Sequence, residues 1–245
     1  MKKTTVIIGD VHGCVDELSE LLNKISYNPA QMELVFLGDL VDRGPDSIGA
    51  VAKVMELGSL CIMGNHENKH IRWRKHENKR KATGKPNPMK PMHLLERKCN
   101  EELTDDQMNW LCNLPLKLDL GDGLWAVHGG CEPRFSLHEQ RESQLLRARF
   151  IDSNGKAVSL NPDKSQPEGT QYWAALWNGP ESIVYGHCVH EGYQPRVDTY
   201  MTHMCLGIDT GCCFGGSLTA AVDKGGSFEL VSVKARREYC RRAGE

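Results

Sequence analysis

Five short stretches of the chain carry carboxylate, amide or imidazole side chains directly after an apolar, strand-like run. They are Gly9-Asp10-Val11-His12-Gly13, Gly38-Asp39-Leu40-Val41-Asp42-Arg43-Gly44, Gly64-Asn65-His66-Glu67, Val127-His128-Gly129-Gly130 and Val184-Tyr185-Gly186-His187. Each stretch alone has a simpler explanation, because a Gly-Asp pair after a strand is more often a turn and a single histidine is more often structural. Together they supply oxygen and imidazole ligands without a thiolate, a mixture that suits manganese, iron or zinc.

Six of these residues are candidate metal ligands: Asp10, His12, Asp39, Asn65, His128 and His187. Two cations that lie ~3.5–4 Å apart need a shared carboxylate. Asp39 is the natural bridge, because it follows the strand of the central stretch. Such a pair of ions lowers the pKa of the water between them and neutralises the oxygens of a phosphate group. The sequence therefore predicts a binuclear metal centre suited to hydrolysis of a phosphate compound.

Three further residues of these stretches complete the predicted chemistry. Arg43 offers a bidentate fork to phosphate oxygens. His66, next to Asn65, is placed to protonate the leaving oxygen, and Asp42 can orient and charge-stabilise that histidine. The simpler alternatives are a surface salt bridge for Arg43, a helix cap for His66 and a turn for Asp42.

The elements that must position these residues follow from hydrophobic periodicity. Strands are expected at 4–8, 34–37, 60–63, 116–120, 124–127, 182–185, 204–208, 217–222 and 228–233, and helices at 14–25, 46–57, 69 onward, 92–99 and after a capping box at 104–107. The remaining segments read as an amphipathic piece at 143–150, a polar loop at 153–170, a helical turn at 172–176 and a frayed tail at 234–245. Strand and helix alternate early and strands follow in series late, which predicts an α/β fold with mixed sheets covered by helices.

Composition is ordinary for a globular protein. The chain has 245 residues, 40% hydrophobic and 25% charged, with a formal net charge of -2. No linker stands out, so we expect a single domain over 1–245 with a basic helix and loop insertion at about 68–91. The charge gives no global attraction for DNA or for a membrane. The ten cysteines form no C-x-x-C pair of the structural-zinc kind, and the apolar run at the start is too short for a signal peptide. No long apolar run occurs elsewhere in the sequence. These features favour a cytoplasmic protein.

The five stretches resemble the motifs GDxHG, GDxVDRG, GNHE, HGG and GH of the PPP-type metallophosphatases, within the calcineurin-like metallophosphoesterases. The resemblance covers roughly residues 6–222, with order and spacing in agreement. It implies two mixed β-sheets packed as a sandwich and flanked by helices. It also implies two divalent metal ions, with manganese foremost and iron, zinc, cobalt or nickel as other choices.

Carried over by motif, the first metal would be held by Asp10, His12 and Asp39, and the second by Asp39, Asn65, His128 and His187. Asp42 and His66 would form the acid pair, while Arg43 and Asn65 would contact the phosphate. The family's second phosphate-binding arginine would be Arg149 in the segment LLRAR, with Arg147 as the fallback.

Different segments of the sequence resemble two branches of the family that act on different substrates. GDLVDRG and GNHE have the form found in Ser/Thr protein phosphatases, whereas NWLCNLPL, YWAALWNGPESIVYGHCV and GIDTGCCFGG are similar to bacterial diadenosine tetraphosphatases. We expect first a phosphomonoesterase or Ser/Thr protein phosphatase that acts by direct attack of a metal-bridging hydroxide, without a covalent phosphoenzyme. The alternative is a diadenosine tetraphosphatase. Phosphoproteins, small phosphoesters and dinucleoside polyphosphates are the corresponding partners.

Other functions fit the sequence less well. His66-Glu67-Asn68-Lys69-His70 matches the zinc-protease motif H-E-x-x-H, but it lies at a helix entrance and leaves the other four stretches unexplained. Neither Cys131 nor Cys188 has the C-x5-R spacing of a cysteine phosphatase. A catalytically inactive scaffold would lack ligands, and all six are present.

The basic stretch 69–90 has two interpretations. It could be a lid that attracts a polyanionic substrate, or a solvated helix and loop, as charge runs usually are. The lid predicts that neutralising Lys79, Arg80 and Lys81 raises KM for a polyphosphate more than for an aryl phosphate.

Overall fold

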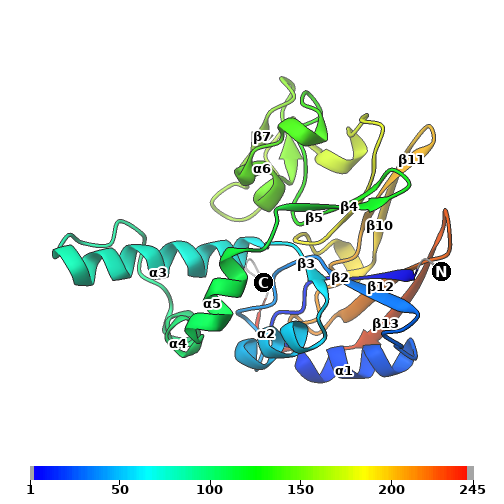
Figure 1. The fold of residues 1–245 in the computed structure, drawn as a ribbon. Coiled ribbons are helices and arrows are strands. Elements are labelled where there is room, and N and C mark those ends of the chain that lie inside the picture. Colours follow the sequence, from blue (N-terminus) through cyan, green and yellow to red (C-terminus); the bar gives the residue numbers. More distant parts are fainter. Residues whose placement is uncertain (1–2, 242–245) are drawn as a thin grey trace.

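Two five-stranded β-sheets lie face to face in the computed structural model, which describes residues 3–241 (Figure 1). The first sheet has the order β13 (Phe228–Lys234), β12 (Ser217–Asp223), β1 (Thr4–Ile8), β2 (Met32–Phe36), β3 (Leu60–Cys61). The second has the order β10 (Arg196–Tyr200), β11 (His203–Gly207), β9 (Ser182–Tyr185), β5 (Leu124–Val127), β4 (Lys117–Gly121). Both sheets mix parallel and antiparallel neighbours, so the predicted sandwich of mixed sheets is confirmed.

Parallel strands form the centre of each sheet. β1, β2 and β3 are parallel neighbours in the first sheet, and β5, β9 and β11 are parallel neighbours in the second. Parallel strands end at the same edge of a sheet, which is where ligands bind in open α/β sheets. The loops that follow these six strands therefore share one end of their sheet.

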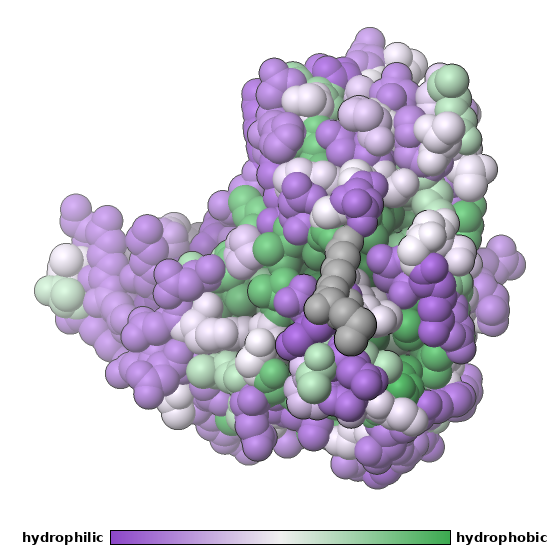
Figure 2. Space-filling view, turned by 45° about the vertical axis from the view of Figure 1, so that its right-hand side comes forward, coloured by the Kyte–Doolittle hydropathy of each residue, from purple (hydrophilic) through white to green (hydrophobic). Residues whose placement is uncertain are grey.

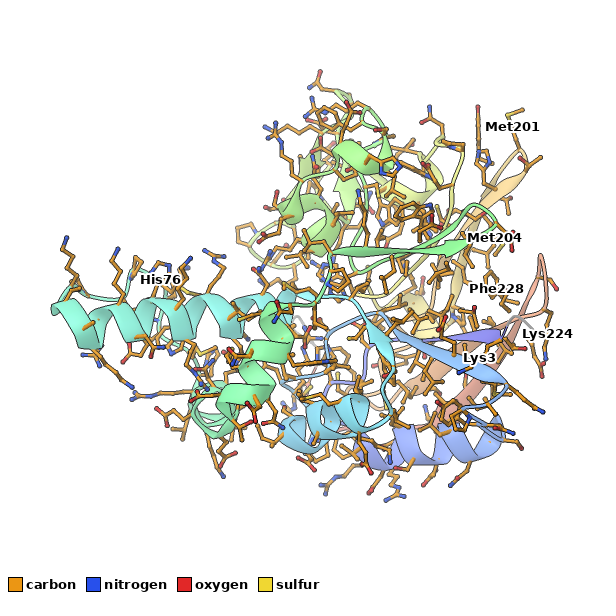
Figure 3. All side chains as sticks on the ribbon, viewed as in Figure 1. Lys3, His76, Met201, Met204, Lys224 and Phe228 are labelled. Carbon is orange, nitrogen blue, oxygen red and sulfur yellow. The ribbon has the colours of Figure 1, made fainter. Side chains whose placement is uncertain are left out.

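The core follows the period of two that a strand imposes on its side chains. In β1, Ile7 faces the second sheet while Val6 and Ile8 face the helices. The layer between the sheets consists of Ile7, Val35, Leu37, Ile62, Ala126, Val184, Leu206, Ile208 and Ala221. Met204 and Phe228 pack against its outer edge, whereas Met201 is 85% exposed at the β10–β11 turn (Figure 3).

Helices cover the outer face of the first sheet. α1 (Val15–Lys24), α2 (Ser47–Glu56) and α5 (Asp105–Cys112) bury apolar side chains against it (Figure 1). The capping box predicted at the start of α5 is confirmed, because Thr104 Oγ1 accepts from the Gln107 N–H and Gln107 Oε1 accepts from the Thr104 N–H. These contacts satisfy amides that a helix start leaves unpaired.

The outer face of the second sheet is covered by short elements that periodicity largely missed. They are the 3₁₀ turns η1 (Leu137–Glu139) and η2 (Trp173–Ala175), helix α6 (Glu142–Arg147) and a small sheet of β7 (Ala157–Val158), β6 (Phe150–Ile151) and β8 (Gln171–Tyr172). Trp173 is fully buried among them. The predicted polar loop 153–170 thus contains a strand, and two-residue strands are too short to give a periodic pattern.

Helix α3 (Asn65–Thr83) extends away from the sheets and returns through a loop to α4 (Leu94–Glu102) (Figure 1). The helix begins at Asn65, in agreement with the helix entrance expected for His66 to His70, and the basic run from Lys69 continues it. Gly64 is extended at the N-cap, and the Glu67 carboxylate accepts its N–H at 2.9 Å. The outer part of the protruding helix is covered by hydrophilic side chains (Figure 2).

Two further expectations need correction. Strand β10 was not predicted, because its alternate residues Val197 and Thr199 face outward. The tail was expected to fray from Lys234, yet Ala235 is buried and Tyr239 donates to Glu17 Oε1. Its last residues, 242–245, lie outside the described part.

Within residues 3–241, no helix is long and apolar enough to cross a membrane. One further 3₁₀ turn, η3 (Glu191–Tyr193), follows His190.

Candidate metal centre

The structure brings the five predicted stretches together around Asp39. One Asp39 oxygen, Oδ2, lies 3.6 Å from His12 Nε2 and 3.9 Å from His66 Nε2. The other, Oδ1, lies 3.4 Å from His128 Nε2. His12, Asp39 and His66 form one group with ligand atoms within 4.8 Å of one another, and Asp39, His128 and His187 form a second. Asp39 thus stands between two clusters of donor atoms, as expected for a shared carboxylate.

The other two predicted ligands complete these clusters. Asn65 Oδ1 lies 3.1 Å from His128 Nε2, at the first turn of α3. Asp10 lies 4.0 Å from His12 Nε2, and both of its oxygens accept from the backbone N–H of His187 at 3.1 Å. A Cβ on Gly186 would lie 2.1 Å from Asp10 Oδ1, so glycine is required directly after β9, where the chain passes this carboxylate.

The backbone at the site is held in an unusual conformation. His12, Asp39, Asp42, Arg43 and His187 all have positive φ, between 45° and 69°. Residues other than glycine rarely adopt this backbone conformation. Those that do cluster at functional sites, where the surrounding contacts enforce the conformation. The strain marks the same residues that the sequence marked by type.

Glu67 provides much of that enforcement. Its buried carboxylate accepts the backbone N–H groups of Asp39 at 2.8 Å, Leu40 at 2.8 Å, Val41 at 3.3 Å and Gly64 at 2.9 Å. One side chain therefore fixes the loop after β2 to the loop after β3. A carboxylate engaged in this way cannot also activate water, so the zinc-protease interpretation of H-E-x-x-H is wrong.

The two histidines of that motif share one partner. His66 Nδ1 lies 2.6 Å from Asp42 Oδ2, and His70 Nε2 lies 2.8 Å from Asp42 Oδ1. Lys69 Nζ donates to Asp42 Oδ2 at 2.6 Å and also pairs with Glu96 of α4 at 2.9 Å. Burial acts to raise the pKa of Asp42, but these imidazoles lower it far below its usual value. Asp42 is therefore ionised and fixed next to His66.

The predicted arginines lie on different sides of the centre. Arg43 Nη1 lies 2.8 Å from His12 Nε2, and its guanidinium stacks on Phe214 at 5.1 Å. Arg149 Nη2 donates to the backbone oxygen of His187 at 3.3 Å, and both Arg43 and Arg149 line one cavity. Arg147 instead donates to Asn68 Oδ1 at 3.3 Å. Arg149 therefore shares a cavity with Arg43, and Arg147 does not.

One buried carboxylate escaped the sequence analysis. Asp209 follows β11 just as Asp10 and Asp39 follow their strands, and it is 4% exposed with an Oδ2 that has no hydrogen-bond partner in the described part of the chain. Burial raises its pKa. The pKa of Asp10 is raised well above its usual range by burial, by Asp209 and by Asp39. The available signal was a charged residue directly after a predicted strand in GIDTG.

The donor set fits a pair of divalent cations. Asp10, Asp39 and Asp209 gather negative charge in a buried space, which is costly unless cations balance it. His12 and His128 direct Nδ1 to the backbone oxygens of Val41 and Leu37 at 2.8 and 2.7 Å, which orients Nε2 toward Asp39. His187 Nε2 is buried without a partner among residues 3–241. Burial holds the pKa of His12 and His187 well below the usual range, so both imidazoles are neutral, as ligation requires.

Comparisons with known proteins agree with this geometry. The family model for calcineurin-like phosphoesterases matches residues 3–202. The asymmetrical bis(5'-nucleosyl)-tetraphosphatases PrpE of Halalkalibacterium halodurans and Bacillus subtilis are each 32% identical to this chain, with 94% and 95% of both chains covered. A crystal structure described as that of a proposed diadenosine tetraphosphatase superposes with a TM-score of 0.75 at 28% identity, over 95% of this chain and 94% of that one.

These matches decide the class of enzyme. Calcineurin-like phosphoesterases use a dinuclear centre of divalent metals, and the convergence on Asp39 supplies the residues for one. The predicted enzyme class is therefore confirmed. The chain belongs to the calcineurin-like phosphoesterase family and is a metal-dependent hydrolase of phosphoester or phosphoanhydride bonds.

Proposed function

We propose that this chain hydrolyses dinucleoside tetraphosphates asymmetrically, to a nucleoside triphosphate and a nucleoside monophosphate. The observation that carries the proposal is the end-to-end similarity to two relatives that bear the name of this activity, at 32% identity. This reverses the order expected from the sequence, which placed phosphomonoesters and phosphoproteins first.

The proposed ligands of one cation are Asp10, His12 and Asp39, and those of the other are Asp39, Asn65, His128 and His187. Asp39 is the shared ligand because its two oxygens face His12 and His128 separately. When bound, two divalent cations activate water and neutralise the oxygens of the phosphate under attack.

The chain's own residues supply the remaining steps. His66 donates a proton to the leaving phosphate oxygen, and Asp42 holds the ring through Nδ1 at 2.6 Å so that Nε2 faces the centre. The guanidinium groups of Arg43 and Arg149 bind phosphate oxygens that the cations leave uncovered. Asn65 contributes its amide to the same phosphate.

A phosphomonoesterase or protein phosphatase is the second candidate. The contact between Asp42 and His66 favours it, because the sequence pattern that supplies both residues resembles the Ser/Thr protein phosphatases. The two candidates share the centre and differ in what lies beyond the scissile phosphate.

A parallel assay with manganese tests the proposal. Diadenosine tetraphosphate, a phosphopeptide and an aryl phosphate are compared by kcat/KM, and the nucleotide products are separated by chromatography. We expect diadenosine tetraphosphate to be preferred by roughly 100-fold or more, with adenosine triphosphate and monophosphate as products. Preference for the phosphopeptide, or equal cleavage to two diphosphates, would overturn it.

Metal removal tests the ligand assignment separately. Chelation should abolish activity toward all three substrates, and manganese should restore it. Elemental analysis should find about two metal ions per wild-type chain. Asp39→Asn should lower that content and the activity together, whereas full metal content in this variant would contradict a shared ligand.

A further inference from the structure

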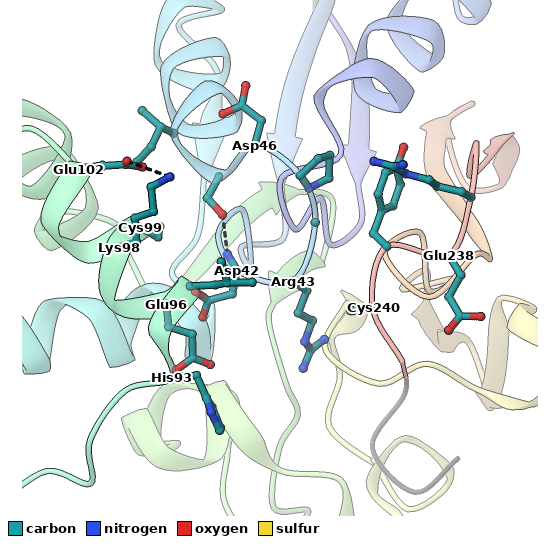
Figure 4. A pocket seen from close by; sticks show the side chains of 17 residues that line it. Asp42, Arg43, Asp46, His93, Glu96, Lys98, Cys99, Glu102, Glu238 and Cys240 are labelled. Atoms are coloured by element: carbon teal, nitrogen blue, oxygen red, sulfur yellow. Dashed lines mark hydrogen bonds and ion pairs between the residues drawn. The ribbon is translucent and has the colours of Figure 1, made fainter.

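Two cavities flank Arg43 and differ in charge. The larger, of about 690 Å³, lies between α2, α4 and the segment 237–240 (Figure 4). Its charged lining has five acidic and three basic residues, and Asp42, Glu96 and Glu238 are among the acids. A polyanion that entered this cavity would meet more negative than positive side chains.

The second cavity, of about 530 Å³, has the opposite character. Its charged lining consists of Arg43, Arg149, Lys164, Arg196 and Glu191. Three aromatic rings, Phe150, Tyr172 and Phe214, also line it. A volume of this size lies within the roughly 300–1,000 Å³ of pockets that enclose a small organic ligand.

The cations of the second cavity fall into two groups. Arg43 and Arg149 contact His12 and His187, respectively, so they belong to the centre. Lys164, in the loop between β7 and β8, and Arg196, on β10, line the same cavity and make no hydrogen bond or ion pair to the six proposed ligands within residues 3–241. Lys164 and Arg196 are therefore placed to bind phosphates farther along a polyphosphate than the phosphate under attack.

Arg196 is held in a fixed orientation. Asp198 accepts from its Nε at 2.7 Å and from its Nη2 at 2.9 Å, and the guanidinium lies 4.4 Å from the centre of the Tyr172 ring. A guanidinium that is already ordered loses less entropy when it binds phosphate. Planar arginine and aromatic groups also offer surfaces on which a nucleobase can stack.

The basic part of α3 is a poor alternative for this role. Lys79, Arg80 and Lys81 lie roughly 21–24 Å along the helix from Asn65, at 1.5 Å per residue. Exposed charges at that distance are screened, because the Debye length is about 8 Å at physiological salt. Arg80 is also paired with Glu77.

Building on the proposed function, we propose that the second cavity binds the part of the substrate beyond the scissile phosphate, namely the remaining phosphates and their nucleoside. Lys164 and Arg196 are then the residues that select a dinucleoside polyphosphate over a simple phosphomonoester. The acidic cavity on the other side of Arg43 takes no part in this selection.

Matched charge reversals test the assignment in the manganese-loaded enzyme. Lys164→Glu, in an exposed loop, should raise KM for diadenosine tetraphosphate about 3- to 10-fold and leave kcat/KM for an aryl phosphate unchanged. Lys98→Glu makes the same change of charge in the acidic cavity and should leave both substrates unaffected. Arg196→Gln should act in the same direction as Lys164→Glu, and its unchanged aryl phosphatase activity would show that it folds.

Salt dependence and inhibition complete the experiment. Added sodium chloride should raise KM for diadenosine tetraphosphate less in Lys164→Glu than in the wild type. The variant has already lost the ionic contact between Lys164 and the substrate phosphates that salt would weaken. Diadenosine tetraphosphate should also inhibit aryl phosphate hydrolysis at constant free manganese, and Lys164→Glu should weaken this inhibition by the same factor.

The outcomes separate the two proposals. If the wild type is inhibited by diadenosine tetraphosphate without cleaving it, and Lys164→Glu relieves the inhibition, the function is wrong and the cavity assignment holds. If cleavage is efficient but neither Lys164→Glu nor Arg196→Gln changes KM, the cavity assignment is wrong and the function holds. If the compound neither inhibits nor is cleaved, both are wrong.

Discussion

The two ends of helix α3 have similar composition and opposite surroundings. At the inner end, the side chains of Asn65, His66, Glu67, Lys69 and His70 all contact the centre or the loops that form it. At the outer end, Lys79, Arg80 and Lys81 are exposed, and His76 lies on the protruding part of the helix (Figure 3). The role of a run of charged residues therefore depends on its distance from the sheet edges that carry the centre.

Burial explains why the same kind of ion pair matters at one end and not at the other. The Asp42 carboxylate that pairs with Lys69 is 1% exposed, whereas the Arg80 side chain that pairs with Glu77 is 49% exposed. Water screens the outer pair and leaves it with little effect on stability. Inside, a lost partner leaves a buried charge uncompensated, which is costly.

The largest contrast is expected for the two glutamates. Glu67→Ala leaves four backbone amides of the central loops unpaired, at about 1–3 kcal/mol for each buried group. We expect its free energy of unfolding in urea to fall by about 3 kcal/mol or more, with loss of metal binding. Glu77→Ala, ten residues along the helix, should leave the urea midpoint unchanged. Equal midpoints for the two variants would refute the role given to Glu67.

The two histidines come next. His66→Ala should lower kcat roughly 100- to 10,000-fold, because it removes the proposed proton donor. The folded state should persist, since Glu67 still holds the loops. His76→Ala is the control and should retain wild-type kcat. A modest loss in His66→Ala, similar to that of the control, would remove His66 from the mechanism.

A smaller difference is expected between two lysines. Lys69→Ala removes one of the three partners of Asp42, so His66 is oriented less firmly and kcat should fall roughly 10-fold. Lys79→Ala should have no effect. The measurement is kcat at saturating substrate, and restored activity in Lys69→Arg would show that the charge is what matters. Wild-type kcat in Lys69→Ala would limit the orienting role to the histidines.

The smallest effect concerns the outer charges together. Replacing Lys79, Arg80 and Lys81 with glutamine should leave KM unchanged within about 2-fold for both diadenosine tetraphosphate and an aryl phosphate, because these charges lie beyond the Debye length. A selective rise in KM for the polyphosphate would restore the lid hypothesis and show that α3 bends toward the site during turnover.

Local patterns were sufficient for most of the centre. Asp10, His12, Asp39, Asn65, His128 and His187 could be named as candidate ligands because each follows a strand with a recognisable apolar run, and parallel strands end at one edge. Asp209 follows the same rule, but its segment GIDTG lies outside the five stretches that predict the centre. The small sheet beside the second cavity was missed, since strands of two residues have no period to detect.

The amino-acid sequence by itself determined the identity of the donor atoms and the strands that carry them, because residue type and short-range periodicity are local properties. Only the tertiary structure decided which charges act together. It placed Glu67 under the backbone amides of the loop after β2, gathered Lys164 and Arg196 into one cavity with Arg149, and directed the basic end of α3 away. These contacts join residues that are not neighbours along the chain, so residue type and short-range periodicity cannot reveal them.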